Sequence, residues 1–140
     1  MIELVKVHDD LPSDVKDNIK DQCVKILNDE WPRSEHLRYR TLNASKDYFP
    51  MCLALVKKPE NVVLGHVKLS EIPSQINAVW VESVVLHPDL RGLGIGKHLM
   101  LKTENFCRDL GYKIAYLCTI DRQVFYSRYD NIRLYIFATL

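Results

Sequence analysis

The sequence predicts an α+β domain with a mixed central sheet, on three observations. Three strand patterns follow one another between residues 51 and 88 with only turns between them, which is typical of antiparallel neighbours. Residues 95–110 then have helical spacing and precede another strand pattern, so the strands on either side of this helix can lie parallel. The length of 140 residues suits one domain with its own core. We therefore expect residues 1–140 to form a single domain.

The N-terminal part is expected to hold one strand and two helices. Residues 2–8 have the β-branched content of a strand. An apolar stripe at helical spacing follows, made by Val15, Ile19, Cys23, Ile26 and Leu27. This helix should end near Trp31, because a residue before proline is disfavoured in the α conformation. A second, short helix is predicted with Ser34 as N-cap and an end at about Leu42.

The remaining elements place one long helix between two strands of the sheet. Strands are predicted at residues 51–57, 62–72, 77–88, 112–118 and 132–140. The long helix is expected to run to Gly111, a natural residue after a helix C-terminus, and a short helix to begin at Asp121. The expected order is β-α-α-β-β-β-α-β-α-β.

Composition limits the classes of function. The net charge is only +1, so the chain lacks the overall field that attracts nucleic acid or an acidic membrane. The four cysteines show no CxxC spacing, and the N-terminus has no charged leader followed by an apolar segment. We expect a cytosolic protein with reduced thiols and no bound metal.

Residues 91–97, RGLGIGK, concentrate three glycines and two basic residues ahead of the long helix. A Walker A loop would need glycine where Arg91 stands and Ser or Thr where His98 stands, and a dinucleotide fingerprint would need glycine in place of Lys97. What remains is a run of backbone N–H groups at a helix start, freed of Cβ bulk, which forms a concave site for a pyrophosphate. A simple tight turn is the alternative interpretation.

The spacing Arg91-x-x-Gly94-x-Gly96, after a strand and before a helix, resembles the acetyl-CoA signature of the GCN5-related N-acetyltransferases (GNAT). The predicted order of elements is also similar to the fold of that family, over about nine tenths of the chain. The resemblance implies a fold in which antiparallel N-terminal strands join one βαβ unit. It also implies acetyl-CoA as the donor in a direct transfer of acetyl to an amine.

The resemblance further implies which residues hold the donor. Main-chain groups would pair with the pantetheine arm where two strands splay apart, at Val84, Val85 and Leu86. Backbone amides would bind the pyrophosphate at Gly92, Leu93, Gly94, Ile95, Gly96 and Lys97. Arg91 would flank the pyrophosphate. Tyr126 matches the tyrosine that protonates the departing thiolate, and Gln123, one turn before it, is expected to face the cofactor.

Transfer to an amine also requires a base, because the amine must lose a proton. Glu82 is the candidate, since residues 80, 82 and 84 of an extended strand share one face, and this face is expected to open toward the acetyl group. The alternative is that Glu82 is a solvated glutamate on the strand surface.

The choice of acceptor is expected to depend on residues 31–42, WPRSEHLRYRTL. Arg33, Arg38 and Arg40 form the densest basic cluster of the chain, and in the family it resembles this connection is a wall of the acceptor groove. The cluster predicts an acidic substrate, with Arg33 and Arg40 on one face if the segment is helical. The predicted substrate-binding residues are Trp31, Arg33, Arg38, Tyr39, Arg40 and Thr41. The alternative is an exposed helix whose arginines are solvated and pair with Glu35.

The segments WPRS, RGLGIGKHLM and TIDRQVFYSR are together similar to the actin N-terminal acetyltransferases (NatH). This implies transfer to the α-amine of processed actin, whose first residues are acidic, and an actin-associated delivery partner is a further expectation. Two alternatives stay open: a GNAT-fold module that binds CoA or a partner with little turnover, and an enzyme acting on another amine. The C-terminal stretch lacks the usual Leu-Gly-aromatic turn and has room for one strand, so an open sheet edge is expected there.

Overall fold

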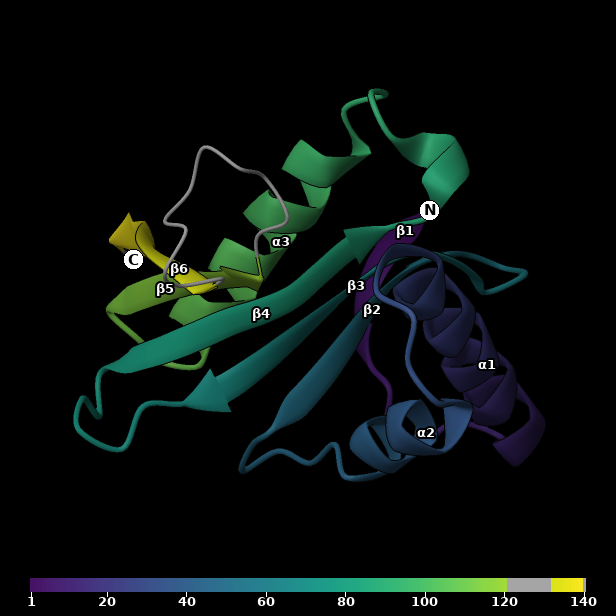
Figure 1. The fold of residues 1–140 in the computed structure, drawn as a ribbon, viewed down its shortest axis with the longest axis horizontal. Coiled ribbons are helices and arrows are strands. Elements are labelled where there is room, and N and C mark those ends of the chain that lie inside the picture. The colour runs from purple at the N-terminus through teal and green to yellow at the C-terminus, as the bar shows by residue number, and fades with distance from the viewer. Residues whose placement is uncertain (121–131, 140) are drawn as a thin grey trace.

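The computed structural model describes residues 1–120 and 132–139, which form a six-stranded sheet with helices on both faces (Figure 1). In chain order the elements are β1 (Ile2–Lys6), α1 (Ser13–Glu30), α2 (Glu35–Asn43), β2 (Met51–Lys57), β3 (Val62–Glu71), β4 (Ala78–Leu86), α3 (Ile95–Asp109), β5 (Ile114–Ile120) and β6 (Ile132–Thr139). A 3-10 turn, Pro88–Leu90, lies between β4 and α3. The predicted α+β class is confirmed.

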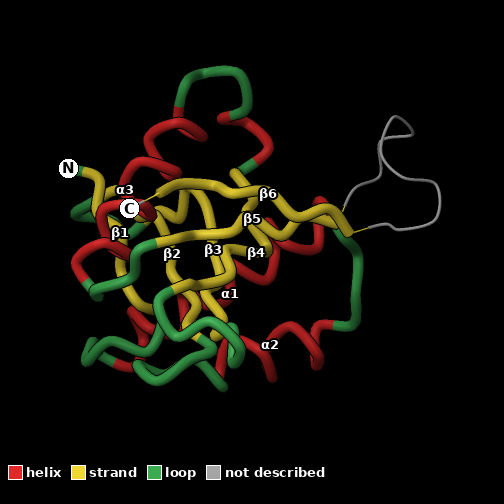
Figure 2. Tube along the Cα trace, turned by 90° about the vertical axis from the view of Figure 1, so that its left-hand side faces the viewer, coloured by secondary structure: helices red, strands yellow, loops and turns green. Residues whose placement is uncertain are grey.

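The strands lie in the order β1-β2-β3-β4-β5-β6, and Figure 2 shows the first four side by side. The pair β4–β5 is parallel, because α3 carries the chain back across the sheet between them, and the other neighbouring pairs are antiparallel. The predicted mixed sheet, with its antiparallel N-terminal strands and one βαβ unit, is therefore confirmed. Among the described residues, β6 is the one strand that follows β5.

Helices α1 and α2 cover one face of the sheet and α3 covers the other (Figure 1). Strand β2 is buried from Met51 to Val56, because its alternate side chains enter two separate cores. The core under α1 receives Cys52, Ala54 and Val56. The core under α3 receives Met51, Leu53 and Leu55. These two cores hold the sheet between α1 and α2 on one side and α3 on the other.

The ends of the first two helices agree with the signals in the sequence. At the end of α1, the Trp31 N–H donates to the Leu27 carbonyl at 2.8 Å before the chain turns away at Pro32. Ser34 is the N-cap of α2, and its hydroxyl accepts from the Leu37 N–H at 3.1 Å. The connection between the helices leaves Trp31 packed against the core under α1.

Two expectations need comment. Strand β4 ends at Leu86 rather than at Pro88, because Pro88 opens the 3-10 turn. The helix predicted from Asp121 lies outside the described residues. In the part of the chain that the structure describes, no helix is both long and apolar enough to cross a membrane.

Candidate active site

The sheet opens between β4 and β5 at the C-terminal end of β4. The two strands pair from Ala78 with Ile114 to Val81 with Leu117, whereas β4 continues to Leu86. Within the described residues, main-chain groups at the end of β4 therefore have no partner on β5. Such groups need a partner from elsewhere. This is the opening that the family resemblance implied, and residues 84–86 lie along it.

A β-bulge in β4 marks the start of the opening. The register shifts between the His66–Val85 pair and the Lys68–Glu82 pair, so one residue of β3 stands opposite two residues of β4. Ser83, inside the bulge, has a φ of +51°, which is uncommon for a residue with a side chain. Because a bulge bends its strand, it turns the end of β4 relative to β5.

The bulge also changes which face each β4 side chain occupies. Val84 packs against the core under α3, whereas Val85 belongs to the core under α1. Glu82 lies on the α1 side, since its partner Lys68 stands opposite Cys52 of that core. The expectation that residues 80, 82 and 84 share one face was therefore wrong for Val84. The bulge depends on pairing with β3, which the residues of β4 alone do not reveal.

The turn that starts α3 has the properties of an anion site. Gly92 and Gly94 have φ values of +82° and +81°, and a Cβ at either would meet nothing within 4 Å. The first backbone bond of the helix joins the His98 N–H to the Gly94 carbonyl at 3.3 Å. The amides of residues 95–97 therefore have no acceptor inside the helix, and they lie at the positive end of its dipole. An anion at this end would satisfy them.

Arg91 and Glu30 form an ion pair beside this turn. Arg91 Nη2 lies 2.9 Å from Glu30 Oε2, and the two side chains are 48% and 24% exposed. Glu30 is the last residue of α1, so the pair connects the end of that helix to the glycine turn. The sequence predicted a role for Arg91 but not for Glu30. Glu30 could have been found in the sequence only from its position directly before Trp31.

A groove of about 430 Å³ joins these parts. Its walls come from the end of α1, the end of β4, Arg91 and the start of α3. The lining residues are Glu30, Trp31, Val84, Val85, Leu86, Arg91, Gly96, Leu99 and Met100. Trp31, predicted for the acceptor, thus lies beside residues predicted for the cofactor. The sequence indicated Leu99 and Met100 only as part of a helix.

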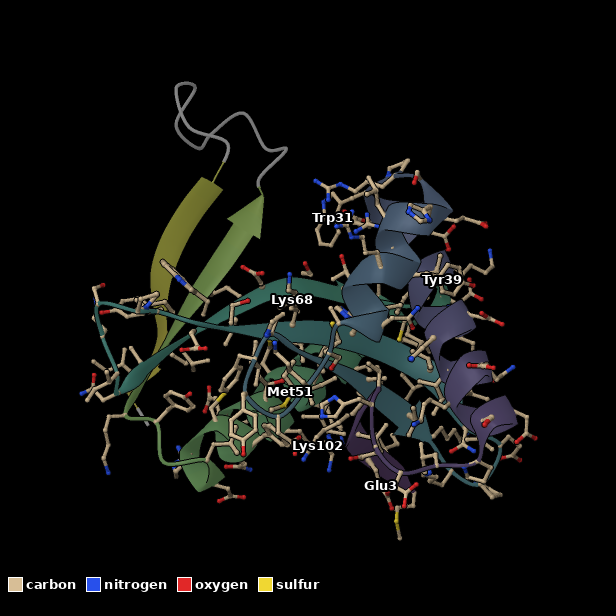
Figure 3. All side chains as sticks on the ribbon, turned by 90° about the horizontal axis from the view of Figure 1, so that it is seen from below. Glu3, Trp31, Tyr39, Met51, Lys68 and Lys102 are labelled. Carbon is tan, nitrogen blue, oxygen red and sulfur yellow. The ribbon has the colours of Figure 1, made fainter. Side chains whose placement is uncertain are left out.

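Glu82 lies just before the bulge, between two polar side chains of β3. Glu82 Oε1 is 3.4 Å from Lys68 Nζ and accepts a hydrogen bond from Ser70 Oγ at 3.2 Å. Figure 3 shows Lys68 on the sheet between the β5–β6 pair and the helices α1 and α2. The sequence did not single out Lys68, because its position opposite Glu82 depends on the register of two strands.

Arg38 supports the connection between α1 and α2. Its Nε donates to Asn28 Oδ1 at 2.9 Å, and its Nη2 donates to the carbonyl oxygen of Trp31. Asn28 Oδ1 also accepts from the Arg33 N–H at 3.0 Å. Burial, together with the nearby charge of Arg33, lowers the pKa of the Arg38 guanidinium. Part of this guanidinium is therefore committed to holding Trp31 at the groove.

The other residues predicted to bind the acceptor differ in their exposure and in whether their side chains already make hydrogen bonds. Arg33 precedes the N-cap of α2 and is exposed, as is Arg40, so the helical face that they were expected to share does not exist. Tyr39 lies between α1 and α2 (Figure 3), and its hydroxyl donates to Asp21 Oδ1 at 2.6 Å. That bond is the main cause that raises the pKa of Tyr39 to about 12. Thr41 Oγ1 donates to a carbonyl of its own helix at 3.2 Å.

The described side chains offer no metal cluster, and the buried thiols of Cys52 and Cys107 are not activated. In residues 1–120 and 132–139, no three His, Cys, Asp or Glu side chains are grouped to hold a metal ion. Burial raises the pKa of Cys52 and of Cys107 to about 12, so both thiols stay protonated and unreactive. Tyr126 and Gln123 lie outside the described residues, and their roles stay predictions.

A pair of parallel strands that parts beside a glycine-led helix N-terminus suits a donor with a pyrophosphate and an extended arm, as acyl-CoA has. The family model described as Acetyltransferase (GNAT) family matches residues 20–135 of the chain. The chain therefore belongs to the GNAT family of acetyltransferases, as the resemblance in its sequence implied.

Among curated proteins, the chain is similar to N-alpha-acetyltransferase 80 of Mus musculus, with 39% identity over 110 residues. The match covers 75% of this chain and 35% of that protein, so the chain spans about a third of the length of this relative. Two solved structures share the fold. Tetrahymena GCN5 has a TM-score of 0.64 at 14% identity, covering 86% of this chain and 71% of the other. A GNAT family acetyltransferase from Brucella melitensis in complex with acetyl-CoA has a TM-score of 0.61 at 18% identity, covering 99% and 89%.

The residues of the groove fit acetyl-CoA. The amides of residues 95–97 and the Arg91 guanidinium suit a pyrophosphate, and the main chain of residues 84–86 suits the amides of a pantetheine arm. Glycine is also needed for space: a Cβ at Gly96 would lie 3.3 Å from Leu86 Cδ1, and one at Gly65 would lie 3.0 Å from the Val85 carbonyl oxygen. Larger residues at either position would press on the end of β4.

Proposed function

We propose that the protein transfers acetyl from acetyl-CoA to the α-amine of a protein whose N-terminus is acidic. The observation that carries this proposal is the 39% identity to a protein named N-alpha-acetyltransferase 80. Membership of the GNAT family supports acetyl-CoA as the donor. The acidic character of the acceptor is argued from the charges around the groove.

The donor end of the groove is the better defined. Acetyl-CoA supplies a thioester whose acyl carbon is open to attack by an amine. The amides of residues 95–97 hold the pyrophosphate, and residues 84–86 hold the arm through their main chain. Arg91 lies beside Glu30 and also binds the pyrophosphate. On binding, its guanidinium exchanges part of its contact with the Glu30 carboxylate for a contact with the pyrophosphate. Predicted contacts from Gln123 complete this end.

The acceptor end carries positive charge that an acidic peptide would neutralise. Arg33 is exposed on the α1–α2 connection and Arg40 in the last turn of α2, and Lys68, paired with Glu82, lies on the α1 side of the sheet. Arg38 contributes by holding the Trp31 main chain in place rather than by offering a solvent-exposed charge to the acceptor. Tyr39 and Thr41 are engaged in bonds with α1 and within α2, so we give them a supporting role. Charge of this kind mainly selects the partner and speeds its encounter.

The chemical step needs a base and an acid. We assign the base to Glu82, acting through a water molecule, because it is a partly exposed carboxylate next to the bulge and Lys68 and Ser70 fix its position. We assign the acid that protonates the thiolate to Tyr126. Backbone N–H groups at the end of β4 are suited to stabilise the charge that develops on the reacting oxygen.

The proposal extends to the acceptor and to its setting. Processed actin begins with a run of acidic residues, which matches the sign of the charge at Arg33 and Arg40. We propose actin as the acceptor, brought by an actin-associated partner, in the cytosol. A GNAT-fold enzyme for polyamines or basic peptides would instead need carboxylates at these positions.

Charge reversal at Arg33 tests the acidic acceptor. The Arg33→Glu variant should raise the KM for a peptide that begins with a run of Asp about three- to tenfold, because an exposed attraction becomes a repulsion. The kcat should change little. The measurement is steady-state kinetics at saturating acetyl-CoA.

Lys113→Glu is the matched control for charge. Lys113 is exposed and lies just before Ile114, at the end of β5 that is paired with β4 and far from the opening. Its KM for the same peptide should equal that of the unmutated protein. Equal increases in KM for both variants would mean that Arg33 has no local role.

A further inference from the structure

His66 is a buried imidazole that touches the bulge of β4. It lies on β3, its exposed fraction is 1%, and its Nδ1 lies 2.9 Å from the carbonyl oxygen of Ser83. A carbonyl oxygen can only accept, so Nδ1 carries the proton and donates it. Nε2 is buried and has no hydrogen-bond partner among the described residues. Burial lowers the pKa of His66 to about 4, so the ring is neutral near pH 7 and this tautomer is fixed.

The bond from His66 holds a peptide group inside the bulge, where the regular pairing of β3 and β4 is interrupted. Ser83 is in the stretch of β4 where two residues face one residue of β3, so the regular pairing of the ladder is interrupted at this peptide group. Its φ of +51° is a conformation that needs support from its surroundings. The His66 imidazole supplies this support from within the core, where a buried carbonyl needs a hydrogen-bond donor.

The orientation of the Ser83 carbonyl also sets the orientation of the next N–H. In a trans peptide the N–H points opposite to the C=O. The Ser83 carbonyl points at an imidazole on the α1 side of β3, so the Val84 N–H points away from that imidazole. Beyond Val81, β5 has parted from β4, and Val84 lines the groove at this opening.

We infer that His66 is a positioning residue, whose imidazole holds the Ser83 carbonyl and thereby aims the Val84 amide into the groove at the oxygen of the reacting carbonyl. This inference deepens the proposed function and rests on it for the identity of that carbonyl. A fixed donor aimed at developing charge is a large source of rate enhancement, and a small misalignment weakens it. Only Nδ1 makes the hydrogen bond to Ser83, so the unprotonated Nε2 has no part in this positioning.

Two amide substitutions separate this role from simple packing. In Asn the amide nitrogen is attached to Cγ, as Nδ1 is in His, whereas in Gln it lies one bond further out. His66→Asn therefore keeps a donor for Ser83, and His66→Gln moves it, although Gln fills the volume of His better. Packing alone predicts that Gln is the better substitute. The positioning role predicts that Asn is.

The first readout is the Val84 amide in the ligand-free protein, observed by ¹H–¹⁵N NMR. Its signal should stay near the original position in His66→Asn and move in His66→Gln. The ring ¹⁵N signals of the unmutated protein should show the proton of His66 on Nδ1. A proton on Nε2, or the same Val84 signal in both variants, would overturn the inference, and the ring measurement holds even if a variant does not fold.

The second readout is turnover with the acidic peptide. His66→Gln should lower kcat about ten- to a hundredfold with little change in the KM for acetyl-CoA, whereas His66→Asn should stay within about threefold of the unmutated protein. Equal losses in both variants would reduce His66 to a packing residue. If the unmutated protein transfers no acetyl, the proposed function fails, and the NMR comparison still decides whether His66 sets the Val84 amide.

Discussion

Replacing Gly94 with aspartate is expected to abolish the binding of CoA. Gly94 is the N-cap of α3 at a φ of +81°, and a Cβ there points into open space beside the free amides of the helix start. An aspartate would place a negative charge where the pyrophosphate belongs. At a separation of about 4–5 Å this repulsion is about 3 kcal/mol or more, which is over a hundredfold in affinity. Isothermal titration calorimetry with CoA measures it.

Gly111→Asp is the control for the same substitution. Gly111 follows the C-terminal end of the same helix, has a φ of +96°, and likewise has nothing within 4 Å of an added Cβ. It therefore reproduces the backbone strain and the added charge away from the groove. We expect Gly111→Asp to lose some stability but to bind CoA normally. A folded Gly94→Asp protein with unchanged CoA affinity would show that the glycine turn does not bind CoA.

The second large effect is expected from Glu82→Gln, which should lower kcat by about 10²- to 10⁴-fold. Glutamine keeps an oxygen that accepts from Ser70 and loses the ability to take a proton. Binding of CoA should be unaffected, because Glu82 precedes the part of β4 that lines the groove. The measurement is the rate of release of the CoA thiol at saturating peptide.

Glu71→Gln serves as the control for that change. Glu71 is the exposed last residue of β3, and it carries the same carboxylate at a distance along the sheet from the bulge. Its kcat should match that of the unmutated protein. A Glu82→Gln variant with full kcat would show that another group takes the proton from the amine, and Glu82 would then be a solvated residue on the strand surface.

The elements of the fold could be predicted because each has a local signal. Pro32 ends α1, Ser34 caps α2, and the apolar run from Met51 to Lys57 forms β2 within its predicted bounds. The glycine turn was predictable for the same reason, since its requirement for positive φ lies in residues that are adjacent in the chain. Local chemistry therefore sufficed to predict the glycine turn, and the cofactor roles of its residues stay predictions.

The parts of the site that sequence did not reveal all depend on contacts between distant segments. The bulge at Ser83 arises from pairing with β3, and it moves Val84 to the other core. The ion pair of Glu30 with Arg91 joins the end of α1 to the turn before α3. Arg38 likewise looked free in the sequence, whereas it donates to the carbonyl of Trp31. Such contacts lie at both ends of the groove, and residues adjacent in the chain carry no signal for them.

The most direct test of the proposed function is mass spectrometry of an acidic peptide that begins like processed actin, after incubation with acetyl-CoA and the protein. We predict the gain of one acetyl group on the α-amine, and a much slower reaction with a basic peptide of the same length. The Gly94→Asp protein should give no product. A CoA-binding module would bind acetyl-CoA and leave the peptide unmodified. An unmodified acidic peptide, or equal modification of acidic and basic peptides, would contradict the proposed function.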